Sequence, residues 1–276
     1  MNSAKQYRIE NEKLLTEYEE RVRKWLLKKG KKELSEKIPF FRDGVTCPEV
    51  WFEKGNNFRP LFVLKEVSLG IDTIEELESY LKTWGNPKYF EFVENPFDDI
   101  KIGKFTQWRR IAKLAKGLKE IHCGADMCDY YKYDLGYKDG GEEYQGNIEG
   151  YKKYFSRTSN QVYNEIINQI AVLEIKKIGA GTNVASELSV ETEYYTSHIE
   201  PFEELICKQI MLIDPTVIIC LGRENGKCIS EQLKPIKEKT GNRIWIDGYH
   251  HIMSSNEKFY YKPIREYKKE LFENFN

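Results

Sequence analysis

The sequence predicts an α/β fold with a central four-stranded parallel sheet flanked by helices on both faces. Three observations indicate it: the chain contains four short apolar runs, helical patterns alternate with these runs, and no repeat or low-complexity linker divides the 276 residues. Continuous apolar runs are typical of strands that are covered on both faces. The expected strands are 60–64, 170–175, 216–221 and 243–246.

Helical periodicity fills the stretches around these strands. The residues before Pro215 end a long helix near Ile213, because the position preceding a proline disfavours the helical conformation. The other expected helices are 5–30, 72–84, 105–120, 151–168, 225–237 and 257–273.

We expect one α/β domain over residues 1–276, with a core at 58–262 and an N-terminal helical extension at 1–57. The stretch between the first two strands is far longer than a minimal crossover needs. Within it, residues 122–150 are rich in Gly, Asp and Tyr, and we expect a long surface insertion there. Either a role in specificity or a simple surface loop fits this composition.

Charge and composition exclude several classes of protein. Lys and Arg total 43 and Asp and Glu total 44, so a uniformly basic coat is excluded, whereas a local basic groove is not. No segment reaches the roughly 18 apolar residues of a membrane span, and the N-terminus lacks a signal-peptide core. The six cysteines are scattered, which is typical of free thiols in a reducing compartment. We expect a cytoplasmic monomer with no membrane partner.

Polar side chains lie within or directly after all four expected strands. Because the carboxyl ends of parallel strands meet at one edge of a sheet, and ligands of open α/β sheets bind there, we expect the site at this edge. Taken singly, each of these groups is also explained by a surface ion pair, a solvated lysine pair or a turn. The groups are Lys65-Glu66, Glu174 with Lys176-Lys177, Gly222-Arg223-Glu224, and Asp247-Gly248-Tyr249-His250-His251.

The order of these segments resembles the uracil-DNA glycosylase superfamily over roughly residues 58–262. Residues 62–68 look like a degenerate form of the family's catalytic motif, with Glu66 at the acidic position and Asp72 as the fallback carboxylate. Residues 214–222 are similar to the strand that runs from a proline to a Leu-Gly pair. Residues 249–254 fall where the family has its histidine motif, so His250 matches the catalytic histidine and His251 replaces a proline.

The resemblance implies a DNA glycosylase that hydrolyses the N-glycosidic bond of a flipped base and leaves an abasic site. Glu66 would stabilise the sugar cation and orient water, and His250 would donate to the departing base. No cofactor is expected. DNA phosphates would contact Lys65, Lys176, Lys177 and Arg223.

One departure from the family bears on the substrate. Glu174 stands where the family has an Asn that reads uracil, and His251 lies beside the catalytic histidine as a second recognition residue. An ionised carboxylate only accepts hydrogen bonds, so it suits the amino group of cytosine and repels the 4-oxygen of uracil. We therefore predict a modified cytosine-type base, with anti-phage defence as a setting and uracil as the alternative base.

Other interpretations remain open at this point. A non-catalytic binder of modified or damaged DNA on the same scaffold is one. An unrelated nucleotide- or sugar-binding α/β enzyme is another, with Gly179-Ala180-Gly181 and Leu221-Gly222 contacting phosphate. We expect no metal, because the spacing of His122, Cys123, Asp126 and Cys128 fits no common site and the cysteine pattern of the iron–sulfur members is absent.

Overall fold

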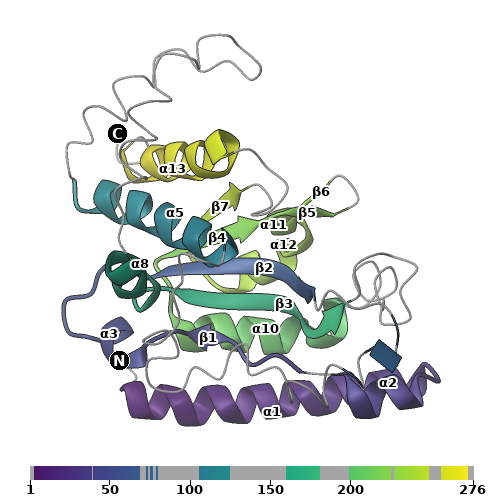
Figure 1. Cartoon of the computed structure of the whole chain (residues 1–276). Helices are drawn as coiled ribbons and strands as arrows, with labels where there is room; N and C mark the ends of the chain where they lie inside the picture. The colour runs from purple at the N-terminus through teal and green to yellow at the C-terminus, as the bar shows by residue number, and fades with distance from the viewer. Residues whose placement is uncertain are drawn as a thin grey trace.

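Five strands form the main sheet, in the order β1-β3-β2-β4-β7 (Figure 1). Neighbouring strands among β3, β2, β4 and β7 pair in parallel, and the short β1 pairs with β3 in antiparallel orientation. The α/β class is therefore confirmed, but the sheet is mixed and five-stranded rather than four-stranded and parallel. The strands are β1 Gly44–Val45, β2 Pro60–Ser68, β3 Ala171–Ala180, β4 Val217–Leu221 and β7 Ile244–Gly248.

The computed structural model describes residues 3–38, 40–68, 73, 75–76, 79, 106–124, 160–180, 199–224, 227–248 and 256–272. Four predicted strands correspond to β2, β3, β4 and β7, and β2 and β3 extend further than the apolar runs alone predict. The two-residue β1 was missed because so short a pairing leaves no periodicity in the sequence.

Alternating side chains of the strands divide the core into two clusters. On β2, Leu61 and Val63 pack into one cluster, whereas Phe62 and Leu64 pack into the other. All four side chains are at most 1% exposed, as expected for a strand that helices cover on both faces.

One helix layer covers the face of Phe62 and Leu64. The stripe of apolar residues on α5, which includes Ile111, Leu114 and Leu118, is fully buried against this face. The layer consists of α5 Thr106–His122, α8 Asn160–Ile167 and α13 Asn256–Phe272.

A second helix layer covers the face of Leu61 and Val63, and α1 belongs to it. Tyr18, Val22 and Leu26 of α1 lie in the same cluster as the β2 side chains, so part of the segment expected as an N-terminal extension contributes to the main core. The helices on this side are α1 Ala4–Lys28, α2 Lys32–Lys37, α3 Pro48–Trp51, α10 Ile199–Ile213, α11 Ile229–Gln232 and α12 Lys234–Lys239.

The helix that precedes β4 ends as predicted. α10 stops at Ile213, and Asp214 follows with a left-handed φ of 51° before Pro215. The Asp214 carboxylate then accepts hydrogen bonds from Arg59 at 2.8 Å and Arg243 at 3.2 Å, which joins the amino ends of β2, β4 and β7.

The single helix predicted over 225–237 is wrong. A small hairpin of β5 Arg223–Glu224 and β6 Lys227–Cys228 comes first, and two short helices, α11 and α12, follow it. Pro235 explains the break at Leu233, since a proline fits the first turn of a helix but not its interior. Nearly all of the helix predicted over 72–84, residues 151–159 and most of the insertion 122–150 lie outside the described residues.

Candidate functional site

The winding of the chain reverses between β2 and β4. From β2 the chain reaches β3 through α5 and α8 on one face, and it then crosses back to β4 through α10 on the other face. From β4 it continues outward to β7 through α11 and α12. In open α/β sheets, a crevice forms outside the carboxyl ends of the strands at such a reversal, so the candidate site lies beyond β2 and β4 (Figure 1).

On the β2 side of this edge, the structure describes the backbone of the expected catalytic residue Glu66. The backbone of Glu66 belongs to β2 and its Cα pairs with Lys176 of β3. The register then shifts before Ser68, which pairs with Ala180. A shift of this kind bends a strand and is frequent beside active sites. The side chains of Lys65 and Glu66, and all of Asp72, lie outside the described residues.

Glu174 lies on β3, directly beside Leu64 of β2. Its neighbour Leu173 packs in the α1 and α10 cluster and Val172 in the α5 cluster, so alternation directs Glu174 toward the α5 layer. The side chain is only 1% exposed. Glu174 and Glu66 thus lie two positions apart along neighbouring strands, at the predicted edge.

Lys177 does not face solvent. Its ammonium donates to both carboxylate oxygens of Asp43, at 2.7 and 2.6 Å, and to the carbonyl of Glu174 at 3.0 Å. Asp43 and Lys177 are both fully buried, and the carboxylate also accepts hydrogen bonds from Gln209 at 2.7 Å and from the Glu174 N–H at 2.5 Å. Burial lowers the pKa of Lys177, and the Asp43 charge opposes this shift.

The prediction that Lys177 binds phosphate is therefore wrong for this conformation. Lys177 instead forms a structural ion pair with Asp43 inside the core. Lys176 is also fully buried, so this conformation does not present it to a DNA backbone either. Sequence reasoning missed Asp43, because this residue lies 134 positions from Lys177 and nothing in the sequence around either residue indicates that the two form a pair.

A glycine turn follows β4 at the same edge. Gly222 has a φ of 127°, its N–H donates to the Gly248 carbonyl, and its own carbonyl accepts from Ile229, both at 3.3 Å. The β5–β6 hairpin follows directly, so no helix begins behind Leu221-Gly222. This geometry removes the helix N-terminus behind Leu221-Gly222 that the phosphate-binding alternative invoked, whereas Gly181 of its other segment lies outside the described residues. The Arg223 side chain lies outside the described residues.

Asp247 stands at the β7 side of the same edge. It pairs with Cys220 of β4, and its N–H donates to the Glu266 carboxylate at 3.3 Å. One oxygen of its carboxylate is buried without a hydrogen-bond partner. Burial raises the pKa of the Cys220 thiol well above its usual range, and the negative charge of Asp247 raises it further. His250 and His251 come immediately after β7 but lie outside the described residues.

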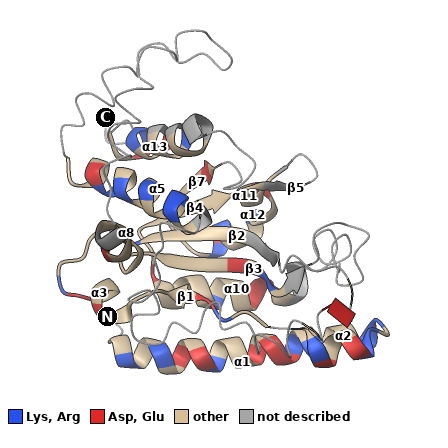
Figure 2. Ribbon diagram, viewed as in Figure 1, with Lys and Arg blue, Asp and Glu red and all other residues tan. Residues whose placement is uncertain are grey.

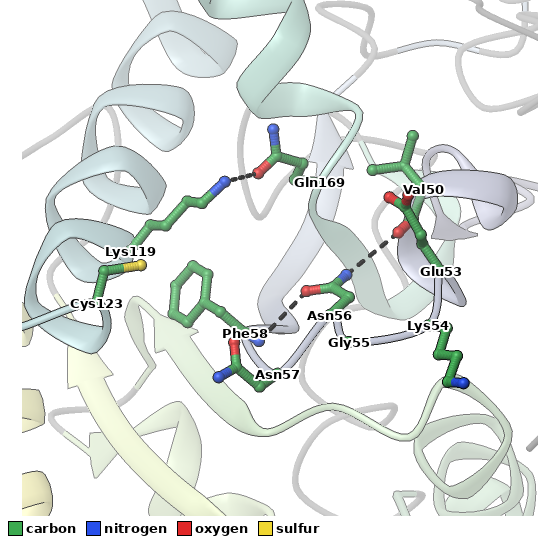
Figure 3. Close-up of a pocket in the computed structure, with 10 residues that line it drawn as sticks. All are labelled: Val50, Glu53, Lys54, Gly55, Asn56, Asn57, Phe58, Lys119, Cys123 and Gln169. Carbon is green, nitrogen blue, oxygen red and sulfur yellow. Dashed lines mark hydrogen bonds between the residues drawn. The ribbon is translucent and has the colours of Figure 1, made fainter.

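A cavity of about 440 Å³ lies at the opposite end of the sheet, before β2 begins (Figure 3). Much of its polar lining is engaged in the fold: Asn56 donates to Val50 and Trp51 carbonyls at 3.2 and 3.1 Å, and Lys119 donates to Gln169. Sequence reasoning did not find this cavity. The turn residues 55–57 are the one local signal, and they predict a loop rather than a pocket.

His122 and Cys123 lie beside this cavity. His122 Nδ1 is 2.7 Å from the Tyr267 hydroxyl and its ring is 5.2 Å from that of Phe58. Burial lowers the pKa of His122. Among the residues that the structure describes, no three His, Cys, Asp or Glu side chains cluster as metal ligands, and Asp126 and Cys128 fall outside that set.

Comparisons with known proteins give no matching family model, no matching curated protein and no matching solved structure. Within the described ranges, none of the helices combines the length and the apolar character that crossing a membrane requires.

Proposed function

We propose that this chain is a DNA glycosylase that removes a flipped, modified cytosine-type base. The strand order is the observation that carries this proposal. β2 and β3, β2 and β4, and β4 and β7 are direct neighbours, and the winding reverses at β2 and β4. Residues far apart in sequence therefore share one edge of the sheet: 62–68, Glu174, 214–222 and the end of β7, which His250 and His251 follow in the sequence.

The chemistry needs a carboxylate and a proton donor on either side of the sugar–base bond. As the C1′–N bond breaks, positive charge grows on the sugar and the bonding electrons leave with the base. Glu66 stabilises that cation and takes a proton from the water whose oxygen adds to C1′. His250 donates a proton or hydrogen bond to the base oxygen, and a preorganised donor of this kind contributes several kcal/mol.

Glu174 supplies the base selectivity in this proposal. A carboxylate at 1% exposure has little access to water, so a partner that donates a hydrogen bond is strongly favoured over one that only accepts. The 4-amino group of a cytosine donates, whereas the 4-oxygen of uracil does not.

The same burial favours a second candidate, a non-catalytic binder of modified or damaged DNA. A carboxylate packed within the α5 layer contacts a base only if the base enters that layer. If the base does not enter that layer, a protein on this scaffold binds DNA but does not release a base from it.

The test compares base release from DNA by wild-type protein and by two variants, Glu66→Gln and His250→Ala. We expect each variant to lose about 10²-fold or more in single-turnover rate, with an unchanged circular dichroism spectrum and melting temperature. Glu53→Gln is the matched control, because this carboxylate lines the cavity at the opposite end of the sheet. An equal loss of rate in the Glu53→Gln control, or the full wild-type rate in both site variants, would contradict the catalytic roles assigned to Glu66 and His250.

A separate variant tests the base contact. Glu174→Gln offers an amide that also donates, so we expect relative activity to shift from cytosine-type toward uracil-type substrates. An unchanged preference in a folded, active variant would exclude Glu174 from base recognition.

A further inference from the structure

The segment before β1 runs along the outer edge of β3 and pairs with it at two separate points. Gly44 pairs with Val172, and Phe40 forms an isolated bridge with Ile178. Between these points the edge segment advances four residues, whereas β3 advances six. The backbone of β3 between them is therefore longer than the backbone opposite, and its N–H and C=O groups need other partners on this side.

The pairing with β2 shows where on β3 the extra residues lie. Glu66 pairs with Lys176 and Ser68 pairs with Ala180, so β3 again advances two residues more than its neighbour. The stretches of β3 defined by its two neighbours have residues 176–178 in common. These three residues form a bulge that shifts the register on both sides, and we call it the β3 bulge.

The packing of side chains agrees with the β3 bulge. Ile175 and Ile178 lie three positions apart and would face opposite sides of a regular strand, yet both pack in the cluster of α1 and α10. Bulges are frequent beside active sites, where they redirect a side chain or end the pairing of a strand. The β3 bulge begins two residues after Glu174, at the edge of the sheet where the candidate site lies.

The buried Asp43–Lys177 pair supplies partners for the backbone beside the β3 bulge. Asp43 Oδ2 accepts a hydrogen bond from the Glu174 N–H at 2.5 Å, and Lys177 Nζ donates to the Glu174 carbonyl at 3.0 Å. The same ammonium donates to both oxygens of the Asp43 carboxylate, at 2.7 and 2.6 Å. The pair therefore holds Glu174 by both of its backbone polar groups.

Two helices hold this arrangement in place. Gln209 of α10 donates to the Asp43 carboxylate at 2.7 Å, and Asn11 of α1 donates to the Asp43 carbonyl at 3.0 Å. The Tyr18 hydroxyl of α1 donates to the carbonyl of Ile175, the next residue of β3, also at 3.0 Å. Because these donors belong to helices packed in the core, they leave the Asp43 carboxylate little freedom to move.

This pair differs from the ion pairs on the surface of the protein. Acidic and basic residues alternate along α1, where Lys24 and Glu20 lie 3.7 Å apart with both side chains more than half exposed (Figure 2). Asp43 and Lys177 are instead 0% exposed. A buried pair adds little stability over apolar residues of similar volume. It does supply hydrogen bonds at fixed positions, which apolar side chains cannot make.

We propose that Asp43 and Lys177 are positioning residues for the base contact of Glu174, an inference that rests on the proposed function. By holding the Glu174 backbone, the pair fixes the point on β3 from which the carboxylate reaches the 4-amino group of the base. A displacement of about 1 Å in such a contact can lower a rate by about 10²-fold. Loss of the pair should therefore weaken the discrimination between cytosine-type and uracil-type bases, in addition to any loss of stability.

Two double variants separate positioning from stability. Asp43→Ala/Lys177→Met removes both charges and both contacts to the Glu174 backbone. Asp43→Asn/Lys177→Gln is the conservative variant, because the Asn oxygen still accepts from the N–H and the Gln amide still donates to the carbonyl. Ile236→Ala on α12 is the stability control, since it opens a cavity at a fully buried position in the connection between β4 and β7.

The preference is the ratio of single-turnover rates of base release from duplexes with glucosylated hydroxymethylcytosine and with uracil. Asp43→Ala/Lys177→Met is expected to lower this ratio about tenfold or more and to speed hydrogen exchange of the Glu174 N–H. The conservative variant should restore most of both. Ile236→Ala should unfold at a lower urea concentration with an unchanged ratio. In a Glu174→Gln background, the first double substitution should change the ratio little, because the residue through which it acts is already altered.

An unchanged ratio or unchanged hydrogen exchange in folded Asp43→Ala/Lys177→Met would overturn the positioning role, as would an equal shift in Ile236→Ala. If the double variant does not fold, Gln209→Met takes its place, because it removes one donor from Asp43 and keeps both charges. An unchanged ratio in that variant overturns the role as well. Without base release by the wild-type protein, the proposed function and the positioning role both fail. Wild-type base release with a ratio that none of these variants alters defeats the positioning role alone.

Discussion

The buried ion pair between Lys177 and Asp43 gives the sharpest prediction about stability. The substitution Lys177→Met keeps most of the side-chain volume but removes the ammonium. Two neutral donors to the carboxylate then remain among the described contacts, the Glu174 N–H at 2.5 Å and Gln209 at 2.7 Å. Both members of the pair are 0% exposed, so the remaining charge cannot be solvated by water.

Breaking a fully buried pair from one side costs about 3–5 kcal/mol. A domain has about 5–15 kcal/mol of stability, so we expect Lys177→Met to lose about a fifth of it or more. The double variant Asp43→Asn/Lys177→Met removes both charges and should lose less than the sum of the single variants. Urea unfolding followed by circular dichroism measures the free energy of unfolding of the two single variants, Asp43→Asn and Lys177→Met, and of the double variant.

An exposed pair of similar geometry is the control. Arg8 and Glu49 form a two-bond contact with side chains 34% and 59% exposed, so Arg8→Met should cost no more than about 1 kcal/mol. If Lys177→Met lost less than about 1 kcal/mol of unfolding free energy, no more than the Arg8→Met control, the buried-pair account would be refuted. A DNA-binding salt slope reduced in a still-folded Lys177→Met variant would instead return Lys177 to the phosphate contacts.

Two further predictions concern local geometry and pH. Gly44 has a φ of 141°, and a Cβ there would overlap the Tyr7 hydroxyl that accepts the Val45 N–H, so Gly44→Ala should cost about 2–4 kcal/mol in urea unfolding. Gly30→Ala, with a φ of 74° and open space, should cost about 1 kcal/mol, and equal losses would contradict the role of Tyr7. Burial holds the pKa of His122 below its usual 6.5 in the folded protein. Between the folded and the unfolded pKa, the unfolded chain therefore binds more protons at this residue than the folded chain does. Its contribution to stability is therefore present above pH 6.5 and lost as the pH falls through the folded pKa. His122→Gln should remove this part of the pH dependence of unfolding between about pH 5 and 7.5, and parallel curves for both proteins would contradict it.

The central strands were predictable because their sequence signal is local. The run from Thr216 to Leu221 is apolar on both faces, and Pro215 marks its start, so β4 follows from the residues alone. The helix ends at Ile213 and His122 were predicted to within two residues for the same reason.

The polar interior was not predictable. Asp43, Lys177 and Gln209 meet only after the chain has folded, and a Lys-Lys pair in isolation is indistinguishable from a solvated surface.

The most direct test of the glycosylase proposal is base release by the wild-type protein. Duplexes carrying uracil, cytosine or glucosylated hydroxymethylcytosine at one position are incubated with the full chain and then cleaved with alkali, which cuts the strand only at abasic sites. We expect cleavage at the modified cytosine, with little at uracil and none at cytosine. Intact strands on all three substrates would contradict catalysis at this edge of the sheet, and cleavage at uracil alone would contradict the role of Glu174.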